Sequence, residues 1–321
     1  MKFALIGYGN VARGLLDILR EKQGEHSFEC AGVLRRSGAR VGPPGEAEPD
    51  CHLQITAAEF LDRCGAEVLV ELSSLNPQTG EPATQHIREA LGRGMHAVTA
   101  NKGPVAHAYC ELAEMAQSRG VRFLHEAAVM DGAPVFNLFR HNLPGVQVLG
   151  FTGVLNSTTK LIIEAMERGA SFEDGVEIAQ KLGIAETNYE HDTQGWDSAV
   201  KTAALANVLM DARITPAAVE REGIHGFSGE GIRELATGGR TVRLVSRGMR
   251  EDGRLKLSVR PEILEKSDLL ASVAGTSNLI LFHTDFMGTI GTVSIAPTVR
   301  QTAYGVYIDL LELTKGTSSI S

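Results

Sequence analysis

The chain has 321 residues, of which 43% are hydrophobic and 22% are charged, and its formal net charge at pH 7 is -8. This composition is typical of a water-soluble globular protein, and the length suits about two domains. Because the net charge is negative, the chain offers no basic face for nucleic acid or for an anionic membrane, so we expect a small-molecule partner.

The first residues and the cysteines predict a cytoplasmic protein. The N-terminus runs directly into a short apolar strand and lacks the apolar core of a signal peptide. No apolar run reaches the about 18 residues that a membrane span needs. The four cysteines show no C-x-x-C spacing, so we expect reduced thiols rather than a zinc or redox motif.

A glycine-rich turn follows the first apolar run, residues 2–6, and precedes apolar residues at helical spacing. In this order, Gly7 permits the tight turn, Gly9 lets the backbone approach a pyrophosphate, and Ala12 keeps helix and strand close. A turn without a ligand is the alternative, but the flanking strand and helix favour a dinucleotide site. The residues expected at the cofactor here are Gly7, Gly9, Asn10, Val11 and Ala12.

The second strand, residues 28–34, ends where a dinucleotide fold usually carries an acid that reads the ribose. This chain has Arg35 and Arg36 there. Two guanidinium groups suit a ribose 2'-phosphate better than a free hydroxyl pair, although they can also be arginines of a solvated loop. We therefore expect a preference for NADP(H), with NAD(H) possible.

Strands and helices alternate up to about residue 134, interrupted by a loop over 38–50 that we expect to be irregular. Ser73 follows the strand 67–72, and Asn101 and Lys102 follow the strand 96–99. The carboxyl ends of parallel strands face the ligand crevice of a doubly wound sheet, so these residues are candidate cofactor contacts. The sequence thus predicts an α/β protein with a Rossmann-type doubly wound parallel sheet in a nucleotide-binding domain over residues 1–134.

The pattern changes after residue 134. Four later strands, joined by tight turns, predict an antiparallel or mixed sheet in a second α+β domain over residues 135–300. The segment 301–321 contains a final helix, which we expect to pack back onto the first domain. The predicted strands are 242–249, 256–261, 279–286 and 289–296.

Acids and a lysine gather between residues 183 and 201. Asp197 and Lys201 stand four residues apart in a predicted helix, so they lie on one face and can handle a proton together. An ordinary exposed salt bridge beside a helix cap is the alternative. Earlier, the hydroxyl-rich turn 156–159 is expected to cap a helix over 160–167.

Five motifs, in order along nearly the whole chain, resemble those of homoserine dehydrogenase in its short form, which lacks a regulatory domain after the catalytic core. They are the glycine turn, residues 98–102 (Val-Thr-Ala-Asn-Lys), residues 126–134, residues 155–159 (Leu-Asn-Ser-Thr-Thr), and the segment from Gly183 to Lys201. The resemblance implies reversible hydride transfer between a nicotinamide and aspartate 4-semialdehyde or homoserine, in the biosynthesis of threonine and methionine. It also implies a homodimer formed through the second domain.

The resemblance further implies roles for single residues. Lys102 and Lys201 match the two functional lysines, with Asp197 beside them as a catalytic candidate. Glu186 and Asp192 match acids at the substrate, Thr158 matches a substrate contact, and the amides at Ser157 and Thr158 suit the substrate carboxylate. A monovalent cation, sodium or potassium, is implied at the backbone carbonyls of Glu126, Val129, Asp131 and Ala133.

Three positions depart from the family pattern. Lys160 stands where an asparagine is common, Ile184 stands where an aromatic residue is common, and residues 294–301 replace a glycine-rich segment near the cofactor. Two alternatives therefore stay open: a related dehydrogenase for another amino acid or small aldehyde, and a non-catalytic dinucleotide sensor. Intact Lys102, Asp197 and Lys201 favour an enzyme, because a sensor has no use for a proton donor.

Overall fold

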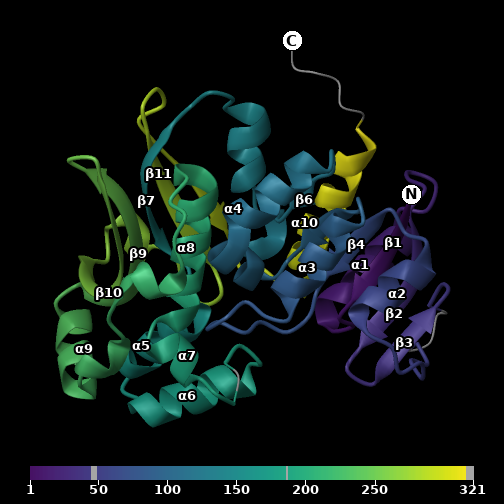
Figure 1. Ribbon diagram of the computed structural model, residues 1–321. Coiled ribbons are helices and arrows are strands. Elements are labelled where there is room, and N and C mark those ends of the chain that lie inside the picture. The colour runs from purple at the N-terminus through teal and green to yellow at the C-terminus, as the bar shows by residue number, and fades with distance from the viewer. Residues whose placement is uncertain (45–48, 186, 316–321) are drawn as a thin grey trace. The chain divides into compact units, whose positions relative to one another are not determined.

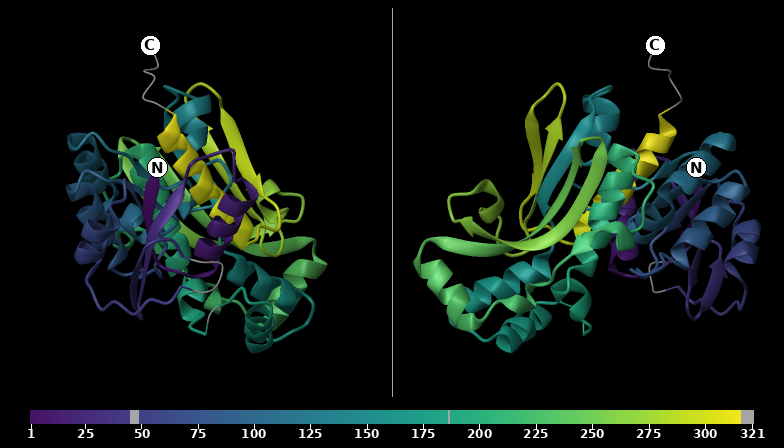
Figure 2. Two further views of the ribbon diagram at one scale, coloured as in Figure 1. Left: turned by 90° about the vertical axis from the view of Figure 1, so that its right-hand side faces the viewer. Right: turned by 60° about the vertical axis from the view of Figure 1, so that its left-hand side comes forward.

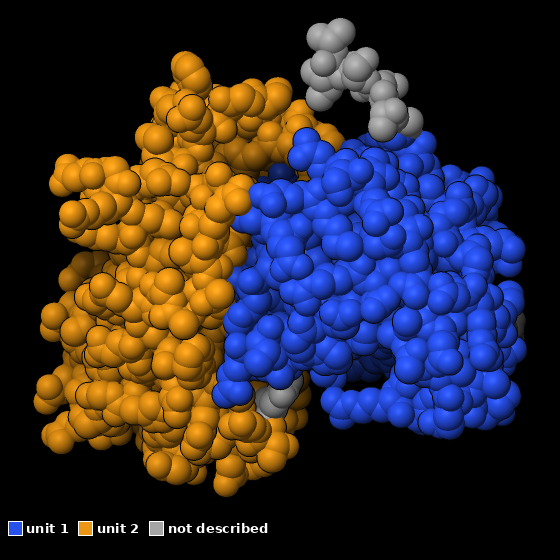
Figure 3. All heavy atoms as spheres, in the orientation of Figure 1, with its two compact units in different colours: residues 1–136, 298–321 blue, residues 137–297 orange. Residues whose placement is uncertain are grey.

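The computed structural model describes residues 1–44, 49–185 and 187–315. The chain divides into two units, one of residues 1–136 with 298–321 and one of residues 137–297 (Figure 3). Glu186, expected at the substrate, lies outside the described residues, as does the end of the segment 301–321. Each unit is built around its own six-stranded sheet.

The sheet of the first unit has the strand order β3-β2-β1-β4-β5-β6 (Figure 1). Neighbouring strands are parallel except β2 and β3, which are antiparallel. The winding direction reverses at β1, and ligands bind outside the carboxyl ends of the strands at such a point. The predicted doubly wound sheet is confirmed. Its strands are β1 (Lys2–Ile6), β2 (Glu29–Arg35), β3 (Gly38–Val41), β4 (Val68–Glu71), β5 (His96–Thr99) and β6 (Phe123–Leu124).

Helices cover both faces of this sheet (Figure 2). On one face, α3 packs against α2 and α4, and on the other α1 packs against the C-terminal α10. Side chains of β1, α1 and α10 share one buried core, to which Leu5, Leu15, Val306 and Leu310 belong. The helices are α1 (Asn10–Glu21), α2 (Ala57–Cys64), α3 (Ala83–Gly92), α4 (Lys102–Ser118) and α10 (Val299–Thr314).

One expectation for the first unit was wrong in detail. The loop predicted as irregular over 38–50 contains β3, which pairs with β2 through the two-residue turn Arg36–Ser37. Gly38 makes this possible, since its φ is +134° and a Cβ atom there would lie 2.7 Å from the carbonyl oxygen of Cys51. Lys102 follows β5, as expected, and is the first residue of α4, whose cap is Asn101.

The sheet of the second unit has the order β12-β11-β7-β9-β10-β8. All neighbours are antiparallel except β8 and β10, which are parallel, so the predicted mixed sheet is confirmed. Its strands are β7 (Val148–Val154), β8 (Glu220–Arg221), β9 (Arg240–Glu251), β10 (Arg254–Glu265), β11 (Asn278–Thr284) and β12 (Thr289–Ser294).

Helices α5 and α8 pack on this sheet and both contact β9. Helix α5 begins at Ser157 rather than at Lys160 as predicted, because the side chain of Asn156 caps it by accepting from the amide of Thr159 at 2.8 Å. The short α7 and α9 were not predicted from the sequence. The helices are α5 (Ser157–Glu167), α6 (Phe172–Lys181), α7 (Glu190–Thr193), α8 (Trp196–Met210) and α9 (Gly229–Thr237).

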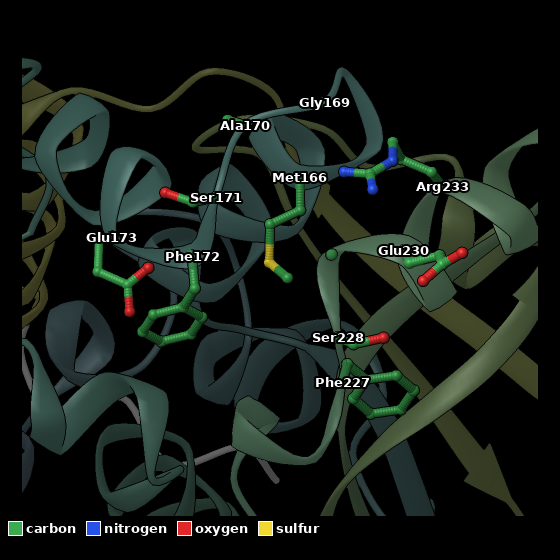
Figure 4. Close-up of a pocket in the computed structure, with 11 residues that line it drawn as sticks. Met166, Gly169, Ala170, Ser171, Phe172, Glu173, Phe227, Ser228, Glu230 and Arg233 are labelled. Atoms are coloured by element: carbon green, nitrogen blue, oxygen red, sulfur yellow. The ribbon is translucent and has the colours of Figure 1, made fainter.

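A pocket of about 500 Å³ lies in the second unit, where the starts of α6 and α9 approach the end of α5 (Figure 4). Met166, Phe172, Phe227 and Arg233 are among its lining residues, and none of the described lining residues is a predicted site residue. Within the described ranges, no helix combines the length and the apolar character needed to cross a membrane.

Candidate active site

A pocket of about 850 Å³ opens at the carboxyl ends of β1, β2 and β4 in the first unit. It lies at the point where the winding of the sheet reverses, the expected place for a dinucleotide. Five of the predicted cofactor residues line it, namely Gly7, Gly9, Arg35, Arg36 and Ser73. Tyr8, Ser37, Ser74, Pro82 and His86 are further lining residues.

The glycine turn has the shape that a pyrophosphate needs. Gly7 has a φ of +92°, its amide donates to the carbonyl of Leu34 at 2.8 Å, and a Cβ atom on it would collide with the carbonyl of Leu72. At Gly9, no atom lies within 4 Å of the position of a Cβ atom, so the backbone is open to close approach. Gly9 caps α1 without a side chain, which leaves the first amides of the helix, from Asn10 onward, to bind an anion.

The two arginines after β2 differ in their surroundings. Arg36 is exposed in the turn between β2 and β3, whereas Arg35 is half-buried. Burial raises the pKa of the Cys51 thiol, and the neighbouring Arg35 guanidinium opposes that rise. Arg35 is therefore held against the body of the unit, and Arg36 is the more accessible cation at the pocket.

Glu71 is a buried carboxylate next to the loop that lines this pocket, and it was not predicted from the sequence. It is fully buried at the end of β4, and it accepts hydrogen bonds from the amide of Ser73 at 3.0 Å and from the hydroxyl of Thr99 at 3.2 Å. Nδ1 of His86 lies 3.6 Å from its Oε1 atom. An acid that ends an apolar strand is the sequence signal that points to such a residue. The network fixes the loop after β4, which lines the pocket.

Asn101 joins this loop to the start of α4. Its side-chain amide donates to the carbonyl of Ser73 at 3.1 Å, and its Oδ1 atom accepts from the amide of Gly103 at 2.9 Å. Gly103 packs closely on Gly80, because a Cβ atom on Gly103 would lie 3.0 Å from the Cα atom of Gly80. These contacts place half-buried Lys102 in the first turn of α4, directly after β5.

In the second unit, Lys201 and Asp197 form the pair that their spacing predicts. Nζ of Lys201 lies 3.0 Å from Oδ2 of Asp197 and donates to the carbonyl of Leu155 at 2.6 Å. The two side chains are only 15% and 16% exposed. The alternative of an ordinary exposed salt bridge is therefore wrong for this pair.

Asp192 of α7 joins the pair through Asn156, which precedes α5. The side-chain amide of Asn156 donates to Asp192 at 2.6 Å and to Asp197 at 3.1 Å, and the hydroxyl of Thr158 donates to Asp192 at 2.9 Å. Burial, followed by the charge of Asp197, raises the pKa of Asp192. Asn156 was not selected from the sequence, although it begins the Asn-Ser-Thr-Thr motif. The hydroxyl of Ser157 donates a hydrogen bond to the carbonyl of Thr276 at 3.3 Å.

The turn expected to bind a cation lies in the first unit and is held by α10. The Glu126 carboxylate accepts from the amide of Val135 at 2.6 Å, and the Glu126 amide donates to Asp309 at 2.9 Å. Asp131 has a φ of 56° and accepts from the Thr302 hydroxyl at 2.9 Å. Among the described side chains, no group of three or more His, Cys, Asp or Glu residues is arranged to hold a metal. A cation at this turn would therefore rely on backbone carbonyls.

Comparisons with known proteins extend over nearly the whole chain. The family model described as homoserine dehydrogenase matches residues 134–311, and the one described as homoserine dehydrogenase, NAD binding domain, matches residues 7–126. The NAD(+)-dependent homoserine dehydrogenase of Pseudomonas canavaninivorans is 31% identical over 97% of this chain and 96% of the relative. The homoserine dehydrogenase of Methanocaldococcus jannaschii is 32% identical, with 99% of each chain covered.

Solved structures give the same result. The homoserine dehydrogenase of Thermoplasma acidophilum superposes with a TM-score of 0.80 at 26% identity, covering 98% of this chain and 99% of its own. That of Thiobacillus denitrificans gives a TM-score of 0.84 at 26% identity, covering 98% of this chain and 73% of its own. The chain therefore belongs to the homoserine dehydrogenase family of oxidoreductases, whose nucleotide-binding domain takes a nicotinamide dinucleotide.

Proposed function

We propose that the chain interconverts L-homoserine and L-aspartate 4-semialdehyde by hydride transfer. The observation that carries the proposal is the buried cluster of Asp192, Asn156, Asp197 and Lys201, in a chain whose other unit has a dinucleotide pocket. Carboxylates suit the ammonium group of an amino acid, and a lysine suits the oxygen of its aldehyde or alcohol.

Lys201 is proposed as a proton donor to the aldehyde oxygen. Reduction of an aldehyde builds negative charge on that oxygen, and a positioned ammonium stabilises the charge and supplies the proton. Two of the three N–H groups of the ammonium meet Leu155 and Asp197. With these partners, which are those that the described residues supply, the third N–H group is proposed to meet the substrate. Lys102 is proposed as the second functional lysine, following the family resemblance.

Asp192 is proposed to bind the substrate ammonium, together with Glu186. Asn156 and Thr158 each donate to one oxygen of Asp192, which fixes its orientation and leaves further lone pairs on both oxygens. The substrate carboxylate is proposed to lie at the first amides of α5, near Ser157 and Thr158. The cap of Asn156 reaches Thr159 and not these two amides.

The cofactor is proposed to be NADP(H) in preference to NAD(H). Its nicotinamide supplies or accepts the hydride when bound. The proposal is supported by the pocket, whose lining includes Arg35, Arg36 and Ser37 at the end of β2 and, among the described residues, no acid. A guanidinium there pairs with a 2'-phosphate, whereas an acid would bind the free ribose hydroxyls.

The reaction is tested by following nicotinamide absorbance with L-aspartate 4-semialdehyde in one direction and L-homoserine in the other. A panel that includes other amino alcohols and small aldehydes separates the proposed substrate from a related dehydrogenase activity. Turnover of homoserine above all others is expected. Binding of the dinucleotide without turnover of any substrate would instead select the sensor alternative.

The cofactor preference is tested with Arg36→Ala and, as a control, Arg40→Ala on the neighbouring strand β3. We expect Arg36→Ala to raise the Michaelis constant for NADPH by roughly 10- to 100-fold, the size of a lost charged hydrogen bond, with little change for NADH. Equal effects on NADPH and NADH would contradict the assignment of Arg36 to the 2'-phosphate.

Three further parts of the proposal follow from the resemblance. A homodimer through the second unit is supported by edge strand β12, where Val293 is 48% exposed and the following Ile295 is 79% exposed. Sedimentation equilibrium tests the homodimer.

A monovalent cation is proposed at the carbonyls of residues 126–133. It is tested by comparing activity in potassium, sodium and tetramethylammonium salts. A cytoplasmic location is consistent with four free cysteines, three of them buried.

A further inference from the structure

One face of α5 holds the loop of residues 275–278, which leads into β11. Three polar side chains of the helix make the contacts, and their spacing of three and four residues puts them on the same face. A helix and a strand end are thereby joined by hydrogen bonds rather than by apolar packing alone. The bonds run from Ser157 Oγ to Thr276 O at 3.3 Å, from Lys160 Nζ to Ser277 O, and from Gly275 N to Glu164 Oε1 at 3.1 Å.

Lys160 is the central contact of the three and the least exposed. Its residue is 1% exposed, and its Nζ atom also lies 3.3 Å from Oδ1 of Asn278. Burial, then the positive charges of Lys201 and Arg243, lower the pKa of Lys160 to about 7, while Glu164 opposes the shift. A neutral amine still has two N–H groups, so both contacts can persist after the proton is lost.

The loop in turn contacts the segment that follows β12. The hydroxyl of Ser277 accepts from the amide of Ala296 at 3.1 Å, and Ala296 has a φ of 45°. Lys160 of α5 and Ala296 are therefore linked through Ser277, with Lys160 at its carbonyl and Ala296 at its hydroxyl.

Lys160 also lies close to the acid–lysine cluster. It follows Thr158, which donates to Asp192, by two residues of α5, and the positive charge of Lys201 acts on it directly. The charged groups that face Lys160 are Lys201 of α8, Arg243 of β9 and Glu164 of α5. Any change in the charge of Lys160 is therefore felt at Lys201.

We propose that Lys160 is a positioning residue that locks the loop 275–278, and with it residues 294–297, to the first turns of α5, and that its charge state adjusts the reaction at Lys201. The kinetic part of this inference rests on the proposed function. The positional part rests on hydrogen bonds within the second unit and is tested independently. Lys160 need not touch the substrate to act in this way.

The kinetic test compares Lys160→Met with Lys160→Gln. Met retains the apolar length of the side chain without the amine, and we expect kcat/KM for homoserine to fall by about tenfold, as for loss of one buried hydrogen bond. Gln retains a donor but does not titrate, so it should recover most of this loss. We expect an inflection near pH 7 in the wild-type profile from Lys160, and both variants should lack it. The KM for the dinucleotide should not change.

Lys181→Met is the matched control, because Lys181 is an exposed lysine of α6 in the same unit, paired with Glu177. It should leave the kinetic constants and the pH profile unchanged. If Lys160→Met and Lys160→Gln both keep the wild-type profile, the role of the charge is refuted. If Lys160→Met does not fold, Lys160→Gln still decides the question of the profile.

Hydrogen exchange tests the positional role without any turnover. The amide of Gly275 donates to Glu164 and the amide of Ala296 donates to Ser277, and these hydrogen bonds protect both amides from exchange. Both amides should therefore exchange faster in Lys160→Met than in the wild type or Lys181→Met. Equal exchange rates would overturn the positional role. A wild-type protein that turns over neither homoserine nor aspartate 4-semialdehyde would refute the proposed function while leaving this exchange result to decide the inference.

Discussion

Burial determines how the carboxylates of the second unit behave. Asp192 is taken out of water beside Asp197, and both effects favour its neutral form, which raises its pKa. The hydrogen bonds from Asn156 and Thr158 favour the ionised form and oppose that rise. Such a site is costly for the folded protein when Asp192 is charged, and an incoming substrate ammonium would offset this cost.

Asp192→Asn should therefore stabilise the free protein at pH 7 while weakening substrate binding. A raised folded-state pKa means that wild-type stability from this group is present at low pH and is lost as pH rises through that pKa. The melting temperature of Asp192→Asn should exceed that of the wild type at pH 7, and this difference should shrink toward pH 4, where Asp192 of the wild type becomes neutral. The KM for homoserine should rise by roughly 10- to 100-fold, the range for a lost charged hydrogen bond.

Asp174→Asn is the control, because the pKa of Asp174 is lowered whereas that of Asp192 is raised. Asp174 caps α6 with Ser171, whose hydrogen bonds lower the pKa of this exposed carboxyl. Its replacement should reduce the melting temperature at pH 7 and leave the KM unchanged. A lower melting temperature in Asp192→Asn would show that Asp192 is a structural acid.

At the scale of residues, the sequence predicted a contact where the two residues lie close together in the chain. Asp197 and Lys201 are four apart in a helix, so their contact follows from helix geometry alone. Asn156 and Asp192 are 36 residues apart, and their contact depends on how α7 returns to the start of α5. No periodicity in the sequence encodes that return, which is why Asn156 was missed.

At the scale of elements, α10 is fitted against the turn of residues 126–134 by glycines. A Cβ atom on Gly132 would collide with the carbonyl of Gln301, and one on Gly305 would lie 3.0 Å from Ala127 and from Asp131. The amide of Glu126 and the carboxylate of Asp309 add a buried hydrogen bond at the same contact. The C-terminal helix thus sets the shape of the proposed cation turn.

Gly132→Ala should separate α10 from this turn, since the colliding partner is backbone and cannot rotate away. We expect destabilisation of about 1–3 kcal/mol, as for other overpacked contacts, measured by thermal or urea unfolding. Gly92→Ala at the end of α3 is the control, because its Cβ atom would meet only Met115, at 3.5 Å. A wild-type melting temperature in Gly132→Ala would show that α10 adjusts freely and does not shape the turn.

The predictions of elements succeeded where one physical signal dominated. The buried parallel strands are continuous apolar runs, and β5 was predicted with its observed limits, His96–Thr99. Strand β3 was missed because it lies in a Gly- and Pro-rich segment and depends on pairing with β2. The first turn of α5 was missed because Ser157, Thr158 and Thr159 have side chains that favour a cap over a helix interior.

At the scale of the whole molecule, each unit gathers its site by a different rule. Gly7, Arg36 and Ser73 follow three parallel strands, and the carboxyl ends of such strands share one edge, so their common pocket was predictable. Asp192 and Lys201 lie on helices around a mixed sheet, for which no comparable rule exists. The family resemblance supplied what topology did not.

The proposed function assigns one lysine in each unit to the same reaction, Lys102 in the first and Lys201 in the second. If both act on one transition-state oxygen, Lys102→Ala and Lys201→Ala should each lower kcat by about 10²-fold or more, the scale of general acid catalysis. The double variant should then lose less than the product of the two single losses, because residues that act as a unit are not additive. Lys181→Ala, at an exposed position, should leave kcat unchanged.

The kinetic experiment needs a measure of cofactor binding beside kcat, because a lysine next to β5 can also contact the dinucleotide. Fluorescence titration with NADPH should give the same dissociation constant for the wild type and Lys201→Ala. If Lys102→Ala weakens that binding and the two losses in kcat multiply strictly, Lys102 serves the cofactor and Lys201 alone handles the proton. A Lys201→Ala variant with wild-type kcat would instead make Lys201 the structural partner of Asp197 and leave Lys102 as the proton donor.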